Sequence, residues 1–271
     1  MKAKIIGLCI FASVILFVIV YVVLQKNETA GVSVKGYVGG EKMGFLEDEK
    51  VASILSKKYK IKMDYRKLGS LEMARESTAD MDFIFPSSSL AAELYKINGG
   101  RSVRSEDVFI SPLVIYSWDI VADALQREGI VSVREDGVNT IDMPKLTELM
   151  KNDVTWNDIG IKELYGQICV YSTDPVHSNS GNLYTALAAT MLNGGNAVRK
   201  TDIPNIIDPL NDILSKSGYK ETSSADLFNQ YLRTGPGGKE MVALYENQII
   251  EFIEQSPGDW EKVKSKIRVL Y

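Results

Sequence analysis

The chain has 271 residues, of which 45% are hydrophobic and 24% are charged, and its formal net charge is −4. This length allows one large domain or two lobes, and the composition is that of a globular protein and not of a disordered one. The acidic balance argues against nucleic acid as a partner, because affinity for nucleic acid comes mainly from basic surfaces. The single histidine, His177, argues against a conventional zinc site, and we predict no metal and no cofactor.

The N-terminal residues have the pattern of a membrane anchor. Lys2 and Lys4 precede an uncharged apolar run at 5–24. As a helix, this run matches the thickness of a bilayer core, and it is longer than the apolar core of a cleaved signal peptide. We therefore predict a cytoplasmic stub at 1–4, one uncleaved transmembrane helix in the cell membrane, and a spacer at 25–31 that leads to an extracytoplasmic domain.

Strands and helices alternate three times in the part of the chain that follows. A strand at 32–38 precedes a segment, 47–59, whose apolar residues have the spacing of one helical face. Two more strands, at 60–67 and 81–85, are each followed by a helix. Such alternation predicts a parallel sheet covered by helices on both faces.

Small polar turns follow each of these three strands, at 39–42, 69–70 and 87–89. Each turn taken singly is an ordinary turn or helix cap. In parallel sheets, however, ligands bind outside the carboxyl ends of the strands. The convergence of three such turns therefore predicts a binding edge.

The second half of the chain alternates less regularly. We predict strands at 108–116 and 242–245, and a short connector at 156–165. The predicted helices are 119–128, 142–152, 204–216, 225–232, 248–255 and 259–266.

The segment 167–195 combines a buried strand at 168–171, a loop rich in hydroxyls, and an alanine-rich helix that ends at Gly194 and Gly195. Free backbone N–H groups at the helix start, beside hydroxyls that also donate, can bind an anion or a polar ligand oxygen. The alternative is that Ser180 merely caps the helix.

The order of these segments resembles that of a known family. The segments are GYVGGEK, YRKLGSLEMA, MDFIFPSSS, SPLVIYSWDIVADAL, STDPVHSNSGN and MVALYENQ. They resemble the extracellular solute-binding proteins of ABC importers, the two-lobed type 2 periplasmic binding proteins, and within these the branch of molybdate, sulfate and phosphate receptors. The resemblance covers nearly all of Val32 to Tyr271.

The resemblance implies an α/β fold of two lobes with mainly parallel sheets, a hinge between them, and a ligand held in the cleft. Lobe 1 would comprise 32–111, the hinge crossing 112–116, and lobe 2 117–266. Residues 267–271 would begin a return crossing, so that lobe 1 is expected to lack its returning elements.

The resemblance also implies site residues. Those from lobe 1 are Gly40, Glu41, Ser70, Leu71, Ser87 and Ser88, and those from lobe 2 are Ser178, Asn179, Ser180 and Tyr245. Several neutral donors around an anion can replace its water shell. Glu41 and Glu246 depart from that pattern, because a carboxylate repels an anion, and they leave a cationic or mixed-charge ligand open.

The leading prediction is a membrane-anchored protein that captures a small solute, an oxyanion above all, and presents it to ABC permease and ATPase subunits. A ligand-binding sensor or accessory protein without a transport role is the alternative. A serine hydrolase that uses Ser180 and His177 is disfavoured, because the chain has no G-x-S-x-G motif and no second histidine. We therefore predict that the protein is not an enzyme.

Overall fold

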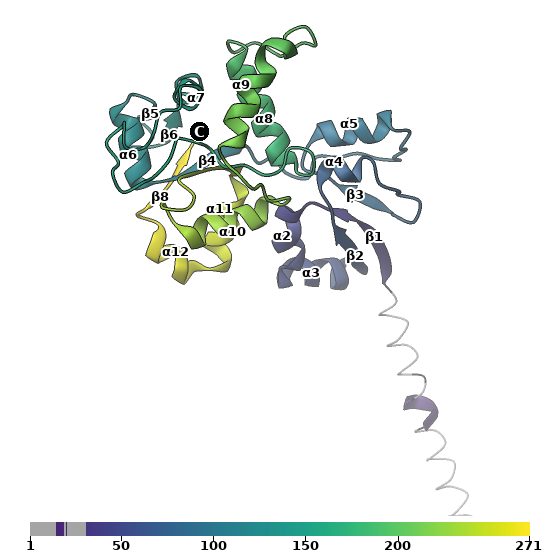
Figure 1. Cartoon of the computed structure of the whole chain (residues 1–271). Coiled ribbons are helices and arrows are strands. Elements are labelled where there is room, and N and C mark those ends of the chain that lie inside the picture. Colours follow the sequence, from purple (N-terminus) through teal and green to yellow (C-terminus); the bar gives the residue numbers. More distant parts are fainter. Residues whose placement is uncertain (1–14, 19, 21–30) are drawn as a thin grey trace, which may run out of the picture.

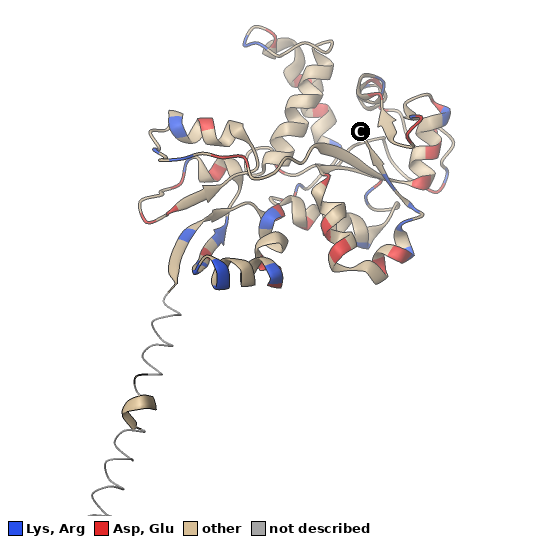
Figure 2. Cartoon of the chain, turned by 180° about the vertical axis from the view of Figure 1, so that it is seen from behind, with Lys and Arg blue, Asp and Glu red and all other residues tan. Residues whose placement is uncertain are grey.

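The computed structural model describes residues 15–18, 20 and 31–271. From residue 31 onward the chain forms two α/β lobes that lie side by side (Figure 1). One lobe contains β1 to β3, and the other contains β4 to β8, with the C-terminus in the second lobe. Lys, Arg, Asp and Glu occur on both lobes (Figure 2).

Most of the predicted membrane anchor lies outside the described residues, namely 5–14, 19 and 21–24. The described residues within it, 15–18 and 20, are helical. No helix among the residues that the structure describes has the length and apolarity needed to cross a membrane. The anchor therefore stays a prediction.

The first lobe contains the predicted parallel sheet. Its strands are β1 (Val32–Val38), β2 (Ile61–Lys67) and β3 (Phe83–Phe85), in the order β2-β1-β3, and both pairs are parallel. The helical elements are η1 (Gly40–Lys42), α2 (Met43–Glu47), α3 (Glu49–Ser53), η2 (Ile54–Lys58), α4 (Ser70–Met73) and α5 (Ser89–Ile97). The sequence thus predicted all three strands of this lobe.

The helix predicted at 47–59 is divided into separate elements. The side chain of Asp48 accepts hydrogen bonds from the backbone N–H groups of Lys50 and Val51, which starts α3 as a new helix after α2. The chain then continues into the π-helical turn η2. The helical prediction is confirmed for most of this segment, but the predicted apolar face is not buried, because Ile54 is 51% exposed and Tyr59 is 55% exposed.

The strand predicted at 108–116 is wrong in its first half. Residues 100–112 contain no helix or strand, and β4 (Leu113–Trp118) begins only after Pro112. Ile110 is 90% exposed and Val108 is 60% exposed, so the apolar residues there are not buried by a sheet. We call residues 101–111 the strap, because they run beside β3 and α5 before the chain enters the second lobe.

The sheet of the second lobe is mixed, and here the expectation of mainly parallel sheets does not hold. Its order is β5-β6-β8-β4-β7. Strand β4 is antiparallel to both neighbours, and only the β6–β8 pair is parallel. The strands that flank or extend β4 are β5 (Val131–Val133), β6 (Asn139–Ile141), β7 (Met241–Tyr245) and β8 (Ile267–Leu270). The hairpin β5–β6 was missed, because each of its strands has only three residues.

Helices cover this sheet close to their predicted positions. They are α6 (Asp119–Arg127), α7 (Met143–Lys151), α8 (Asn179–Leu192), α9 (Ile203–Ser215), α10 (Ser224–Thr234), α11 (Asn247–Gln255) and α12 (Pro257–Val263). Asp142 caps α7 by accepting a hydrogen bond from the backbone N–H of Lys145 at 3.1 Å.

The strand predicted at 168–171 is reduced to a single bridge. The backbone N–H of Tyr171 donates to Met241 O, and that of Ala243 donates to Tyr171 O, both at 2.9 Å. Ile168 is fully buried, so the burial was predicted correctly although the pairing was not. This bridge fixes the loop before α8 against β7.

Truncation of Leu125 tests the core of the second lobe. Leu125 on α6 is fully buried in the main hydrophobic cluster, and Leu125→Ala should lower the free energy of unfolding by about 2–5 kcal/mol. Ile120→Ala on the same helix, where the side chain is 41% exposed, should cost under about 1 kcal/mol. Urea unfolding followed by tryptophan fluorescence reports on this lobe, because Trp118, Trp156 and Trp260 all lie in it. Equal losses in the two variants would contradict the assignment of the core.

Candidate functional site

Two serines join the ends of β2 and β3 in the first lobe. Ser70 begins α4, and Ser87 follows β3. The backbone N–H of Ser87 donates to Ser70 Oγ at 2.9 Å, and the two hydroxyls lie 3.0 Å apart. Two of the three predicted turns are therefore in direct contact at the carboxyl edge of the sheet.

The third turn adds a buried ion pair. Glu41 Oε1 accepts hydrogen bonds from the Lys42 ammonium and from the Ser87 hydroxyl, and the two charged side chains are only 10% and 4% exposed. Burial lowers the pKa of Lys42, and the neighbouring carboxylate of Glu41 acts in the opposite direction. Lys42 Nζ also donates to Ser87 Oγ at 3.0 Å and lies 4.9 Å from the ring centre of Phe85.

Lys42 was missed by the sequence analysis. A lysine in a turn is normally solvated, so the only available signal was its position next to Glu41 in the glycine turn. The pairing matters for the net charge of the site. The ammonium group of Lys42 offsets the carboxylate of Glu41, which on its own would repel an anionic ligand. Glu246 is the second carboxylate that departs from the expected pattern of neutral donors. It accepts a hydrogen bond from the Tyr271 hydroxyl and is not among the described residues that line the cavities near Glu41.

The start of α8 forms the facing wall from the second lobe. Ser178 occupies the N-cap position, so the alternative in which Ser180 caps this helix is wrong. Ser180 is fully buried in the first turn, where its hydroxyl lies 2.7 Å from Thr173 Oγ1 and 3.2 Å from Ser178 Oγ. Ser180 therefore holds the loop before α8 in place.

Asn179 links the two lobes. Ser88 Oγ, from the first lobe, donates to Asn179 Oδ1 at 2.7 Å, and Asn179 Nδ2 donates to the hydroxyl of Tyr245 at 2.8 Å. Burial raises the pKa of Tyr245 far above its usual value, and the charge of Glu41 acts in the same direction. The phenol therefore stays neutral and keeps its proton as a donor.

A cavity of about 260 Å³ lies between these groups, and we call it the inter-lobe cavity. Its lining residues are Gly39, Gly40, Glu41, Lys67, Leu68, Gly69, Ser70, Glu72, Ser87, Ser178, Asn179, Thr222, Ser223, Ser224 and Tyr245. Seven of the ten predicted site residues are among them. The exceptions are Ser88, which lines the neighbouring pocket, and Leu71 and Ser180, which are buried and do not line the cavity. Whether the seven contact a ligand stays a prediction.

The N-terminus of α10 is a further part of this wall that the sequence analysis did not assign. Ser223 is the N-cap residue of α10 and is 6% exposed. Its hydroxyl is buried, lines the cavity, and has no hydrogen-bond partner among the described residues. A buried polar group without a partner is costly, so a ligand atom that accepts or donates here would remove that cost. The run Thr-Ser-Ser before a helix was the available signal.

Two glycines allow the lobes to come this close. A Cβ added to Gly69 would lie 1.8 Å from the backbone oxygen of His177, and one added to Gly40 would lie 2.6 Å from Ser223 Oγ. Any larger residue at either position would collide with the opposite lobe. Glycine is thus required here for close approach, in addition to its role in turns.

The arrangement of His177 does not match that of a serine hydrolase. Its Nδ1 lies 3.2 Å from Asp174 Oδ1, and its Nε2 lies 4.0 Å from Glu72 Oε1. The hydroxyl of Ser180, the suggested nucleophile, is hydrogen-bonded to the hydroxyls of Thr173 and Ser178 and not to His177. Among the described residues, no group of three or more His, Cys, Asp or Glu side chains could hold a metal ion.

Comparison with solved structures agrees with this two-lobed architecture. The sulfate-binding protein SubI from Mycobacterium tuberculosis H37Rv aligns over 89% of this chain and 70% of its own, with a TM-score of 0.52 and 12% sequence identity. This chain therefore has a fold similar to that of this sulfate-binding protein. The periplasmic binding protein P5PA aligns over 88% of this chain and 69% of its own, with a TM-score of 0.42 and 12% identity. No protein-family model and no curated protein matches the sequence.

The substitution Gly69→Ala tests the closed arrangement of the lobes in this solute-binding fold. The added methyl group would collide with the backbone oxygen of His177, so the lobes should move apart. We expect a larger radius of gyration by small-angle X-ray scattering. Gly258→Ala is the matched control, because a Cβ there meets no atom within 4 Å. An unchanged radius in Gly69→Ala would show that the contact does not limit closure.

Glu41 and Lys42 should contribute to the free energy of unfolding as a coupled pair. Glu41→Gln or Lys42→Met leaves the other charge buried without its partner, which should lower the free energy of unfolding of lobe 1 by about 3–5 kcal/mol. The double variant should lose less than the sum, because it removes both charges. Circular dichroism during urea unfolding measures this. Additive losses would mean that the two charges are stabilised independently.

Proposed function

We propose that this protein is a membrane-anchored, extracytoplasmic solute-binding protein that captures a small oxyanion in the inter-lobe cavity and presents it to the permease and ATPase subunits of an ABC importer. The observation that supports this most directly is a polar cavity between two lobes that has an unpartnered, buried hydroxyl, that of Ser223, in its wall. The cavity volume of about 260 Å³ is that of a small solute and not of a polymer.

The donors around the cavity suit an oxygen-rich ligand. Hydroxyls come from both lobes, and the first turns of α8 and α10 add backbone N–H groups and the positive ends of two helix dipoles. A ligand that bonds to donors of both lobes stabilises the closed form, because only the closed form offers all of them at once.

Two of the three charged side chains that line the cavity are in ion pairs, and the third, Glu72, accepts a hydrogen bond from the backbone N–H of Gly69 at 3.0 Å. Glu41 is paired with Lys42, and Lys67 lies 3.2 Å from Asp226 of the opposite lobe. An anion bound beside Glu41 therefore meets neutral donors and a carboxylate whose charge Lys42 offsets. The pair Lys67–Asp226 is half exposed, and such a pair adds little to stability, so it orients the lobes more than it holds them together.

A ligand screen tests the proposal. The purified full chain is heated with sulfate, phosphate, molybdate or tungstate, and separately with divalent metal ions or amino compounds, and the melting temperature is followed. An oxyanion that binds the folded state should raise the melting temperature, and the shift should grow with its concentration. Shifts with cations alone would reverse the proposed charge of the ligand. No shift with any oxyanion, in protein shown to be folded, would contradict the proposal.

Ser223→Ala should separate a ligand contact from a structural role. Without ligand, the melting temperature should stay the same or rise, because the lost hydroxyl has no partner. Affinity for the oxyanion should fall by about tenfold or more, since a hydrogen bond to a charged group is worth about 1.5–3 kcal/mol. Isothermal titration calorimetry measures the affinity.

Ser217→Ala is the matched control for this prediction. Ser217 is as buried as Ser223, but its hydroxyl donates to Leu214 O at 2.9 Å and lies outside the cavity lining. Its loss should lower stability and leave affinity unchanged. If the two variants behaved alike, Ser223 would not be a ligand contact.

A further inference from the structure

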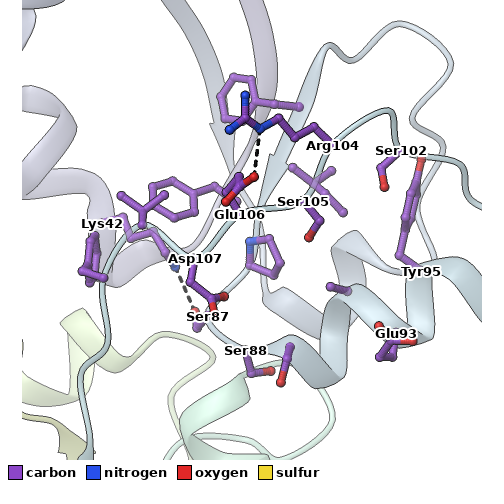
Figure 3. A pocket seen from close by; sticks show the side chains of 18 of the residues that line it. Lys42, Ser87, Ser88, Glu93, Tyr95, Ser102, Arg104, Ser105, Glu106 and Asp107 are labelled. Carbon is purple, nitrogen blue, oxygen red and sulfur yellow. Dashed lines mark hydrogen bonds and ion pairs between the residues drawn. The ribbon is translucent and has the colours of Figure 1, made fainter.

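A second, larger cavity adjoins the inter-lobe cavity. It has a volume of about 660 Å³ and lies between β3, α5 and the strap. Figure 3 shows Lys42, Ser87 and Asp107 at one end of this cavity, and Glu93, Tyr95 and Ser102 at the other. We call it the strap groove.

Three residues line both cavities: Glu41, Ser87 and Tyr245. The strap groove therefore adjoins the candidate ligand site, and these three side chains form the boundary between them. A ligand in the inter-lobe cavity would reach the groove with a substituent by displacing one of these side chains.

Part of the wall of the groove is apolar. Phe85 and Phe109 contact each other edge to face, with ring centres 6.1 Å apart, and Phe83, Pro86 and Val108 extend the surface. Phe109 is 45% exposed and Val108 is 60% exposed. The groove thus has apolar surface that water covers and that an apolar group of a ligand could cover instead.

Three ion pairs account for six of the nine charged side chains that line the groove, and the other three are Asp82, Arg101 and Asp107. Arg104 is paired with Glu106 at 2.9 Å, Lys96 with Glu93 at 2.6 Å, and Lys42 with Glu41. A second acidic or basic group on the ligand would have to compete with these pairs. An alkyl or aryl group could occupy the groove without breaking any of these ion pairs.

We propose that the natural ligand is an organic oxyanion and not an inorganic one: an acidic head in the inter-lobe cavity that carries an alkyl or aryl substituent in the strap groove. This inference rests on the proposed function, since it assigns the head to the same cavity. It makes Phe109 a residue that determines specificity, because its half-exposed ring is part of the apolar wall of the groove.

A homologous series of ligands tests the inference. The purified full chain is titrated calorimetrically with inorganic phosphate and with methyl-, ethyl-, propyl- and butylphosphonate, and likewise with sulfate and the corresponding alkanesulfonates. Each added methylene that is buried should tighten binding by about fourfold. In Phe109→Ala the gain per methylene should shrink, while binding of the inorganic ion should stay unchanged.

Tyr59→Ala serves as the matched control, because Tyr59 is an exposed aromatic residue of the same lobe that lines neither cavity. It should retain the full gain per methylene. A flat series with tight binding of the inorganic ion would overturn the inference and leave the proposed function intact. Binding of neither the inorganic ions nor the organic series would contradict both. A gain per methylene that persists in Phe109→Ala would place the substituent elsewhere and would also overturn the inference.

Discussion

The contact between the lobes depends on a short chain of hydrogen bonds, from Ser88 through Asn179 to Tyr245. The first residue belongs to lobe 1 and the other two to lobe 2, so this chain exists only when the lobes are closed. All three residues are buried or half-buried, where a hydrogen bond is stronger and an unmade one is costly. These hydrogen bonds therefore favour the closed arrangement of the lobes.

The buried pair Glu41–Lys42 gives the same region its charge balance. A lone carboxylate at the end of β1 would oppose an anionic head, and a lone ammonium would bind any anion without discrimination. As a pair they cancel, and selection is left to the geometry of the neutral donors. The orphan hydroxyl of Ser223 is the clearest of these donors, because its lack of a partner is a cost that a fitting ligand removes.

The sequence predicted lobe 1 well because its signals are local. Each strand is followed by a small polar turn and a helix, and the parallel sheet follows from that alternation. Lobe 2 was predicted less well, since the direction of β7 and β8 relative to β4 depends on contacts distant in sequence. At the site, turns such as Ser70 and Ser87 were recognisable, but Lys42 was not, because burial of a lysine is decided by its surroundings. Ser223 was missed for a similar reason: its hydroxyl matters only because α10 faces the opposite lobe.

The central position of β4 has a consequence for how the molecule forms. Its two neighbours, β7 and β8, pair with it from about 130 and 150 residues further along the chain. Lobe 1, by contrast, pairs strands within about 50 residues of one another. Because distant pairings require the closure of long loops, they form slowly. Lobe 1 should therefore acquire its sheet while β4 is still without partners, and during that interval the apolar strand Leu113–Trp118 is open to aggregation.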